Sequence, residues 1–248
     1  MYPKGTIYVQ ELGEFSGQKS LHAPLIVKLI YKFIQFVAAG VASAGILFVI
    51  LFYGPLLKAE LRYQMGAVNH APTSAYAYFD LAEAVQANST KAVQEMAATY
   101  GVDPGFGIVV PKIEAKSNVI ANVDATDEAA YMEALESGVA HAAGSYFPGQ
   151  GESIFLFSHS TNSPLNVARF NAVFYLLRKL EPGDQVLVFF ADKLYEYEVD
   201  YKTITDSSDT RWLSHDFGTE RLVMQTCDPP GTSINRMIIT AKLKKVVG

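Results

Sequence analysis

The stretch from Leu222 to Thr240 reads LVMQTC-DPPGTS-INRMIIT. Two apolar, strand-like runs flank a turn-rich segment, which is the pattern of a β-hairpin. If the runs pair antiparallel, the end of the first lies beside the start of the second. Cys227 and Arg236 then share one end of a sheet, where the guanidinium favours the thiolate form of the cysteine. The stretch therefore predicts a sheet with a thiol nucleophile at a strand end.

Cys227 is the only cysteine in the chain, so it cannot form an internal disulfide. A lone cysteine is a reactive thiol, half of an intermolecular bridge or a buried inert residue. For a lone cysteine the buried inert residue is the commoner case. The nearby arginine and the turn shift the balance toward a reactive thiol and leave both interpretations open.

A long apolar segment precedes the rest of the chain. From Phe33 to Leu57 there is no charged residue, and this length suits a helix that crosses a hydrocarbon core of about 30 Å. It exceeds the core of a cleavable signal peptide, so we expect an uncleaved anchor. The flanking basic residues are Lys19, Lys28 and Lys32 before it, and Lys58 and Arg62 after it. The slight excess before the segment predicts a cytoplasmic N-terminus and a C-terminal part outside the cytoplasm.

The chain is expected to divide into a cytoplasmic tail (1–32), the anchor (33–57), a helical stalk or linker (58–105) and a β-barrel (106–248). Within the stalk, the alanine-rich residues 75–100 are predicted to be helical, with a break at 88–90. The formal net charge is −5, and no basic run occurs outside the anchor flanks. This charge pattern argues against nucleic acid as a partner.

Short apolar runs alternate with turns after residue 105, so we expect a mainly β fold with a closed or nearly closed barrel and few helices. The predicted strands are 108–110, 118–120, 153–158, 185–190, 193–200, 222–227 and 234–240. One helix is predicted at 127–136, capped by Thr126 and closed by Gly138. A second, amphipathic helix is predicted at 167–180.

A proton-transfer partner of Cys227 should lie at a strand end near the same edge of the sheet. Of the five histidines, His159 fits best, because it follows the apolar run 153–158 and precedes a polar loop. His141 follows a helix end and is the main competitor. The others fit less well: His22 precedes the anchor, His70 lies in the stalk, and His215 lies in a loop.

The order and spacing of several short motifs resemble the sortases, membrane-anchored cysteine transpeptidases of bacterial surfaces. The motifs are IVVPKI (108–113), GVAH (138–141), YFPG (146–149), SH (158–159), GDQV (183–186), VMQTC (223–227) and Arg236. The resemblance runs from about Gly107 to Leu243. The chain departs from the family pattern at Val223 and Met224, which replace Thr and Leu, and at Ser158, which replaces a small residue.

The resemblance implies cleavage of a C-terminal sorting motif of the LPxTG kind in a secreted protein, followed by its transfer to an amine on the cell wall or on a pilin. Cys227 would form the thioacyl enzyme, His159 would transfer protons, and Arg236 would bind the substrate carbonyl or oxyanion. Thr226 would assist beside the oxyanion, and His141 would be structural or accessory.

The resemblance implies no metal or organic cofactor. The loop with Asp206, Asp209 and Asp216 offers oxygen ligands for calcium, but a solvated acidic loop is the favoured interpretation.

Three alternatives to a wall-anchoring sortase remain open at the level of sequence. The first is another wall-acting cysteine transpeptidase, the L,D-type, whose signature is missing around Cys227. The second is a non-catalytic anchored barrel that binds surface proteins. The third is a pilin-polymerising sortase, whose lid carries Asp-Pro-aromatic. Here Asp103-Pro104-Gly105-Phe106 misses that pattern by one residue, and no second C-terminal anchor follows, so this subclass ranks lower.

Overall fold

The computed structural model describes residues 24–68, 90–160 and 173–248, without the side chains of residues 52, 55 and 56. The chain divides into two units, residues 1–51 and 52–248. The predicted positions that lie outside the described residues are the tail up to residue 23, His22, His70 and helical residues 75–89.

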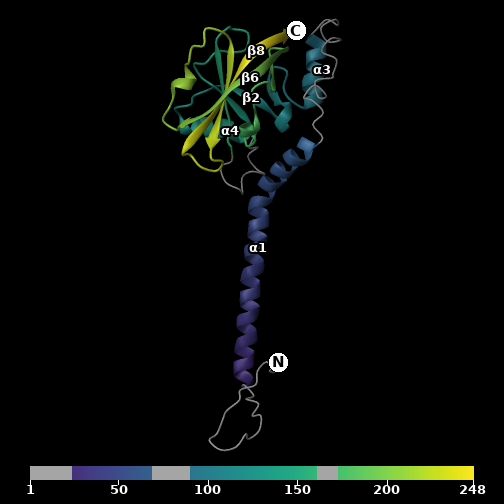
Figure 1. Ribbon diagram of the computed structural model, residues 1–248, viewed down its shortest axis with the longest axis vertical. Coiled ribbons are helices and arrows are strands. Elements are labelled where there is room, and N and C mark those ends of the chain that lie inside the picture. Colours follow the sequence, from purple (N-terminus) through teal and green to yellow (C-terminus); the bar gives the residue numbers. More distant parts are fainter. Residues whose placement is uncertain (1–23, 69–89, 161–172) are drawn as a thin grey trace, which may run out of the picture. The chain divides into compact units, whose positions relative to one another are not determined.

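Helix α1 (Leu25–Val68) begins in the first unit (Figure 1). Its segment Leu25–Leu51 has 27 residues and is long and apolar enough to cross a membrane. The side chains of this segment are exposed. The segment overlaps the predicted anchor, and the boundaries of tail, anchor and stalk stay predictions.

The second unit is built around a closed barrel, which confirms the predicted fold class (Figure 1). Around the barrel the strand order is β1-β2-β3-β4-β7-β8-β6-β5, and β5 pairs with β1. The strands are β1 (Phe106–Val110), β2 (Ala115–Val123), β3 (Val139–Ala142), β4 (Ser153–Phe157), β5 (Gln185–Phe190), β6 (Lys193–Asp206), β7 (Arg221–Asp228) and β8 (Asn235–Val247). The pairs β2–β3 and β4–β7 are parallel, and the other pairs are antiparallel.

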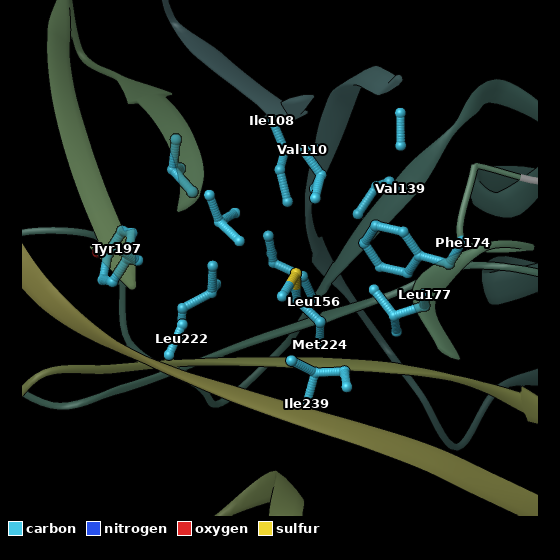
Figure 2. Close-up of a cluster of buried hydrophobic side chains, with 14 of the residues drawn as sticks. Ile108, Val110, Val139, Leu156, Phe174, Leu177, Tyr197, Leu222, Met224 and Ile239 are labelled. Carbon is cyan, nitrogen blue, oxygen red and sulfur yellow. The ribbon is translucent and has the colours of Figure 1, made fainter. Parts of the chain in front are cut away.

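The barrel interior follows from the two-residue alternation of side chains along each strand. Leu156 of β4, Met224 of β7 and Ile239 of β8 point inward and pack together (Figure 2). The neighbouring residues along each strand point outward. Among them, Phe155, Val223 and Ile238 belong to a second apolar cluster on the outer face. The strands that carry the predicted site therefore have an inner face that fills the core and an outer face that is free to form a site.

Two helices cover parts of the outer surface. Helix α3 (Thr90–Tyr100) buries Val93, Met96 and Ala97 against the outer faces of β5 and β6. Helix α4 (Glu128–Ser137) connects the parallel strands β2 and β3. The predicted cap of α4 is wrong: the Asp127 side chain accepts from the backbone N–H groups of residues 129 and 130, while Thr126 bonds to Asp124. Asp127 is the cap because its carboxylate reaches these two N–H groups.

The predicted helix at 167–180 is also wrong for its described part. Residues 173–176 form turns, and only the 3₁₀ turn η3 (Leu177–Lys179) follows. Phe174, Leu177 and Leu180 are fully buried in the barrel core. Their spacing of three places them on one face of a 3₁₀ turn, in which residues i and i+3 are aligned. The apolar spacing therefore indicates a buried face, which is confirmed for Phe174, Leu177 and Leu180, but not the α-helix.

Candidate active site

The predicted site residues lie on the outer face of three adjacent strands. Cys227 of β7 is directly opposite Arg236 of β8. Strand β4 runs parallel to β7 and pairs Phe157 with Gln225, so His159, two residues later, lies level with Cys227. The order β4-β7-β8 therefore places His159, Cys227 and Arg236 side by side, as the sequence predicted.

These side chains line one groove with a volume of about 540 Å³. Its floor includes the outward-facing side chains of β4 and β7. One wall is α4, through Tyr131 and Leu135, and the other is the segment from Ser207 to Leu213 between β6 and β7.

The Cys227 thiol is half-buried, and two effects act on its pKa. Burial raises the pKa above its ordinary value of 9.0, because it disfavours the charged thiolate, and the Arg236 guanidinium opposes this shift. Arg236 Nη1 donates to the carbonyl oxygens of Ser233 and Asn235, both at 3.2 Å. These bonds orient the guanidinium at the start of β8, on the same face as the thiol.

His159 is 8 % exposed and lines the groove together with residues of β7 and α4. Burial lowers its pKa below the ordinary value of 6.5, and the Glu136 carboxylate on α4 opposes this shift. Burial thus favours the uncharged forms of both the imidazole and the thiol.

Hydroxyl groups connect the residues that precede the histidine and the cysteine. Thr226 Oγ1 donates to the carbonyl oxygen of Ser158 at 2.9 Å. Ser158 Oγ in turn donates to the carbonyl oxygen of Gly138 at 3.1 Å. Because the one hydroxyl proton of Thr226 is used in this bond, the geometry favours a positioning role for that hydroxyl. The predicted oxyanion role of Thr226 stays a prediction.

His141 has the surroundings of a structural residue. It is fully buried on β3, and its Nδ1 accepts from the N–H of Asn122 at 3.3 Å. That bond places the proton on Nε2, which lies 2.9 Å from the carbonyl oxygen of Tyr146. The ring also stacks on Phe147 with centroids 4.4 Å apart. His141 does not line the groove with Cys227.

The remaining predicted positions lie apart from the reacting groups or have other partners. His215 packs between Trp212 and Phe217 in the segment before β7. Both carboxylate oxygens of Asp209 accept from Arg211, each at 2.8 Å. No metal-ligand cluster of His, Cys, Asp or Glu occurs among the described residues.

The Asp103-Pro104-Gly105 turn lies far from the groove. The carbonyl oxygens of Pro104 and Gly105 accept from Asp192 and Ala191, in the turn that begins β6. The groove lies at the other end of β6, where Asp206 pairs with Asn235. This turn is therefore not placed to cover Cys227.

Sequence reasoning missed three parts of the site: the charge of Glu136, the bonds of Ser158 and the walls of the groove. Glu136 was inside a predicted helix, but nothing local indicated that this helix would lie beside the histidine. Ser158 carried one signal, because it departs from the motif that the chain resembles. At that position the Ser158 hydroxyl forms a bond to Gly138.

The chain is similar to several known proteins. The family model described as Sortase domain matches residues 108–244, which is more than half of the chain. Sortase D of Bacillus subtilis is 30 % identical over 136 residues, which cover 54 % of this chain and 60 % of that protein. The chain thus spans less than two thirds of this relative.

Two solved structures illustrate the similarity. Sortase C-1 from Actinomyces oris is 24 % identical, with 64 % of this chain and 80 % of that chain covered and a TM-score of 0.49. Sortase E1 from Streptomyces coelicolor, crystallised with a tripeptide in its active site, is 22 % identical, with 58 % and 90 % covered and a TM-score of 0.49.

Proposed function

This chain belongs to the sortase family, and from that premise we propose that it is a membrane-anchored cysteine transpeptidase. It cleaves a sorting motif of the LPxTG kind near the C-terminus of a secreted protein and joins the new carboxyl end to a cell-surface amine. The observation that carries the proposal is the register that brings His159, Cys227 and Arg236 together in one groove.

In the first step, the Cys227 thiolate attacks the threonine carbonyl carbon of the motif. The C–N bond breaks, a thioester to Cys227 forms, and the His159 imidazolium gives its proton to the leaving amine. Arg236 donates hydrogen bonds to the oxygen that becomes negative during the attack. Arg236 Nη1 already donates to two backbone carbonyl oxygens. Nη2 and Nε of Arg236 have no protein partner within the described residues, so they are the donors available to the substrate.

In the second step, an amine of the cell wall or of a pilin attacks the thioester. His159 accepts the proton of that amine, the Cys227 thiolate leaves, and an amide joins the two molecules. The buried imidazole suits this step, because its lowered pKa keeps it neutral and able to accept a proton. Water in place of the amine would give hydrolysis.

The pKa directions predict a bell-shaped dependence of kcat/KM on pH. The acid limb belongs to protonation of the His159–Cys227 pair, at a pKa shifted down by burial of the imidazole. The base limb belongs to loss of the remaining proton, at a pKa shifted up by burial of the thiol. Activity is therefore highest between the two values, where the pair holds one proton.

Membrane anchoring completes the proposal. The apolar segment Leu25–Leu51 would hold the enzyme in the bilayer, with residues 58–248 on the outer side, where secreted substrates and wall amines are found. Protease treatment of intact cells should then remove the barrel. Protection of the barrel until the cells are lysed would reverse this topology.

The function is tested with a fluorescent LPxTG-type peptide and a small amine acceptor. The full chain should cleave the peptide after threonine and produce the joined product, while Cys227→Ala should produce neither. The same assay is repeated with peptides that carry other sorting motifs and with several acceptor amines, so that it identifies the preferred substrate and acceptor. Failure of every motif to react with a folded enzyme would contradict the proposed activity.

A further inference from the structure

Ser158 uses all of its polar groups at the edge of the groove. Its N–H donates to the carbonyl oxygen of Gln225 at 3.2 Å, and its Oγ donates to that of Gly138 at 3.1 Å. Its own carbonyl oxygen accepts from Thr226 Oγ1 at 2.9 Å. Ser158 and Thr226 are each 5 % exposed. Ser158 thus bonds to Gly138, which directly precedes β3, and to Gln225 and Thr226 near the end of β7.

These bonds begin where the regular strand pairing ends. The last paired residue of β4 is Phe157, which lies opposite Ala140 of β3 and Gln225 of β7. Beyond it, hydroxyl groups continue the connection between the three strands, and the next residue is His159. Side-chain bonds to the backbone replace ladder bonds that strand ends lack.

We propose that Ser158 is a positioning residue that sets the spacing between the His159 imidazole and the Cys227 thiol. Thr226 Oγ1 donates to the backbone carbonyl of Ser158, which joins the two residues that directly precede the imidazole and the thiol and does not depend on the Ser158 side chain. The Ser158 hydroxyl contributes the bond to Gly138. The bond to Gly138 holds the histidine backbone against the end of α4. For its effect on turnover the inference rests on the proposed function. A displacement of a reacting group by about 1 Å can cost about 10²-fold in rate.

Ser153 provides a matched control. It is a serine of the same strand, it is 6 % exposed, and it lies at the end of β4 away from His159. Its buried Oγ has no hydrogen-bond partner within the described part of the chain. Ser153→Ala therefore removes the same atom without removing a bond.

The test compares Ser158→Ala, Ser158→Thr and Ser153→Ala in the full chain, with a thermal melt to confirm folding. Ser158→Ala should lower kcat by about ten- to a hundredfold and leave KM for the peptide within about twofold. Ser158→Thr keeps the hydroxyl and should restore most of the rate, and Ser153→Ala should match wild type. Ser158→Ala keeps both backbone bonds of residue 158 and removes only the bond to Gly138. If it does not fold, Ser158→Gly, which also removes only that bond, takes its place.

A second readout needs no sorting peptide. Alkylation of Cys227 by iodoacetamide should depend on pH with two inflections in wild type, because the inference requires the imidazole to lie near enough for its protonation to change the pKa of the thiol. Glu136 on α4 and Arg236 on β8 are the charges that act on this pair. The lower inflection should weaken in Ser158→Ala and persist in Ser153→Ala.

Three results would overturn the inference: an unchanged kcat and alkylation profile in folded Ser158→Ala, equal damage by Ser153→Ala, or a wild-type profile without a histidine inflection. If wild type processes no sorting peptide, the proposed function fails, and the alkylation profiles still decide the role of Ser158.

Discussion

At the scale of single residues, Arg236 has two effects that substitutions can separate. Its charge lowers the pKa of the Cys227 thiol against the effect of burial, and its planar guanidinium can donate two hydrogen bonds to one oxygen. Arg236→Gln should remove both effects. Arg236→Lys should keep the charge and lose the planar arrangement of hydrogen-bond donors.

The expected result is a shift of the alkylation curve of Cys227 to higher pH in Arg236→Gln and a smaller shift in Arg236→Lys. Turnover should fall by about 10²–10³-fold in Arg236→Gln and recover only partly in Arg236→Lys. An alkylation curve that stays in place in Arg236→Gln would show that the guanidinium does not act on the thiol.

The two buried histidines should respond to alanine in opposite ways. His159→Ala should lower kcat/KM by about 10²–10⁴-fold, because proton transfer is lost, with little loss of stability. His141→Ala should leave the rate per folded molecule largely intact. It should cost about 1–3 kcal/mol of stability, because the buried partners of both ring nitrogens lose their bonds.

Rates on one peptide and thermal melts for both variants decide this point. Equal damage to the rate by His141→Ala, in a protein that melts like wild type, would show that the wrong histidine was chosen.

At the scale of elements, the end of α4 matters because Gly138 both closes this helix and bonds to Ser158. Its φ is +155°, and an added Cβ would lie 2.9 Å from the carbonyl oxygen of Asn118 and in contact with the Ser117 hydroxyl. Gly138→Ala should therefore destabilise the barrel by more than about 2 kcal/mol and displace one wall of the groove.

Gly144→Ala is the matched control, since Gly144 also has a positive φ, +86°, but an added Cβ would meet nothing within 4 Å. It should cost only about 1 kcal/mol, from the backbone conformation alone. Thermal melts compare the two, and a Gly138→Ala variant as stable as Gly144→Ala would contradict the predicted steric conflict.

The elements also show what the sequence could reveal. Strands β7 and β8 and their hairpin were predictable, because alternation and turn residues are local signals, and with them came Cys227 opposite Arg236. Burial of Phe174 and Leu177 was predictable from their spacing, but the turn and the short 3₁₀ helix that contain them were not, because packing in the core determines this geometry. Glu136 beside His159 depends on the packing of α4 against the barrel, which no local pattern encodes.

At the scale of the whole molecule, the continuation of α1 beyond the apolar segment docks on the barrel. Glu60 accepts from Arg178 at 2.9 Å and from Lys179 at 2.6 Å, with all three side chains less than a third exposed. The hydrogen bond from Lys179 is the main cause that lowers the pKa of Glu60 below 4.5, and burial opposes it. The stabilisation by this carboxylate is therefore fully present above pH 4.5 and is lost as pH falls through the lowered pKa.

Glu60→Gln should destabilise the full chain in detergent by about 1 kcal/mol at pH 7, and the difference from wild type should vanish in acid. Glu114→Gln is the control, because the Glu114–Arg62 pair is 3.6 Å long and mostly exposed, so it should change little. Thermal melts across pH check this, and a Glu60→Gln deficit that persists unchanged in acid would contradict the role of the charge.

The central claim is that the lone thiol carries the acyl group, and intact-mass measurement of the enzyme with a sorting peptide tests it most directly. The account predicts that wild type gains the mass of the peptide up to its threonine, that the adduct maps to Cys227, and that an added amine removes it. It predicts no adduct on Cys227→Ala. An adduct on another residue, or full turnover by folded Cys227→Ala, would contradict the account.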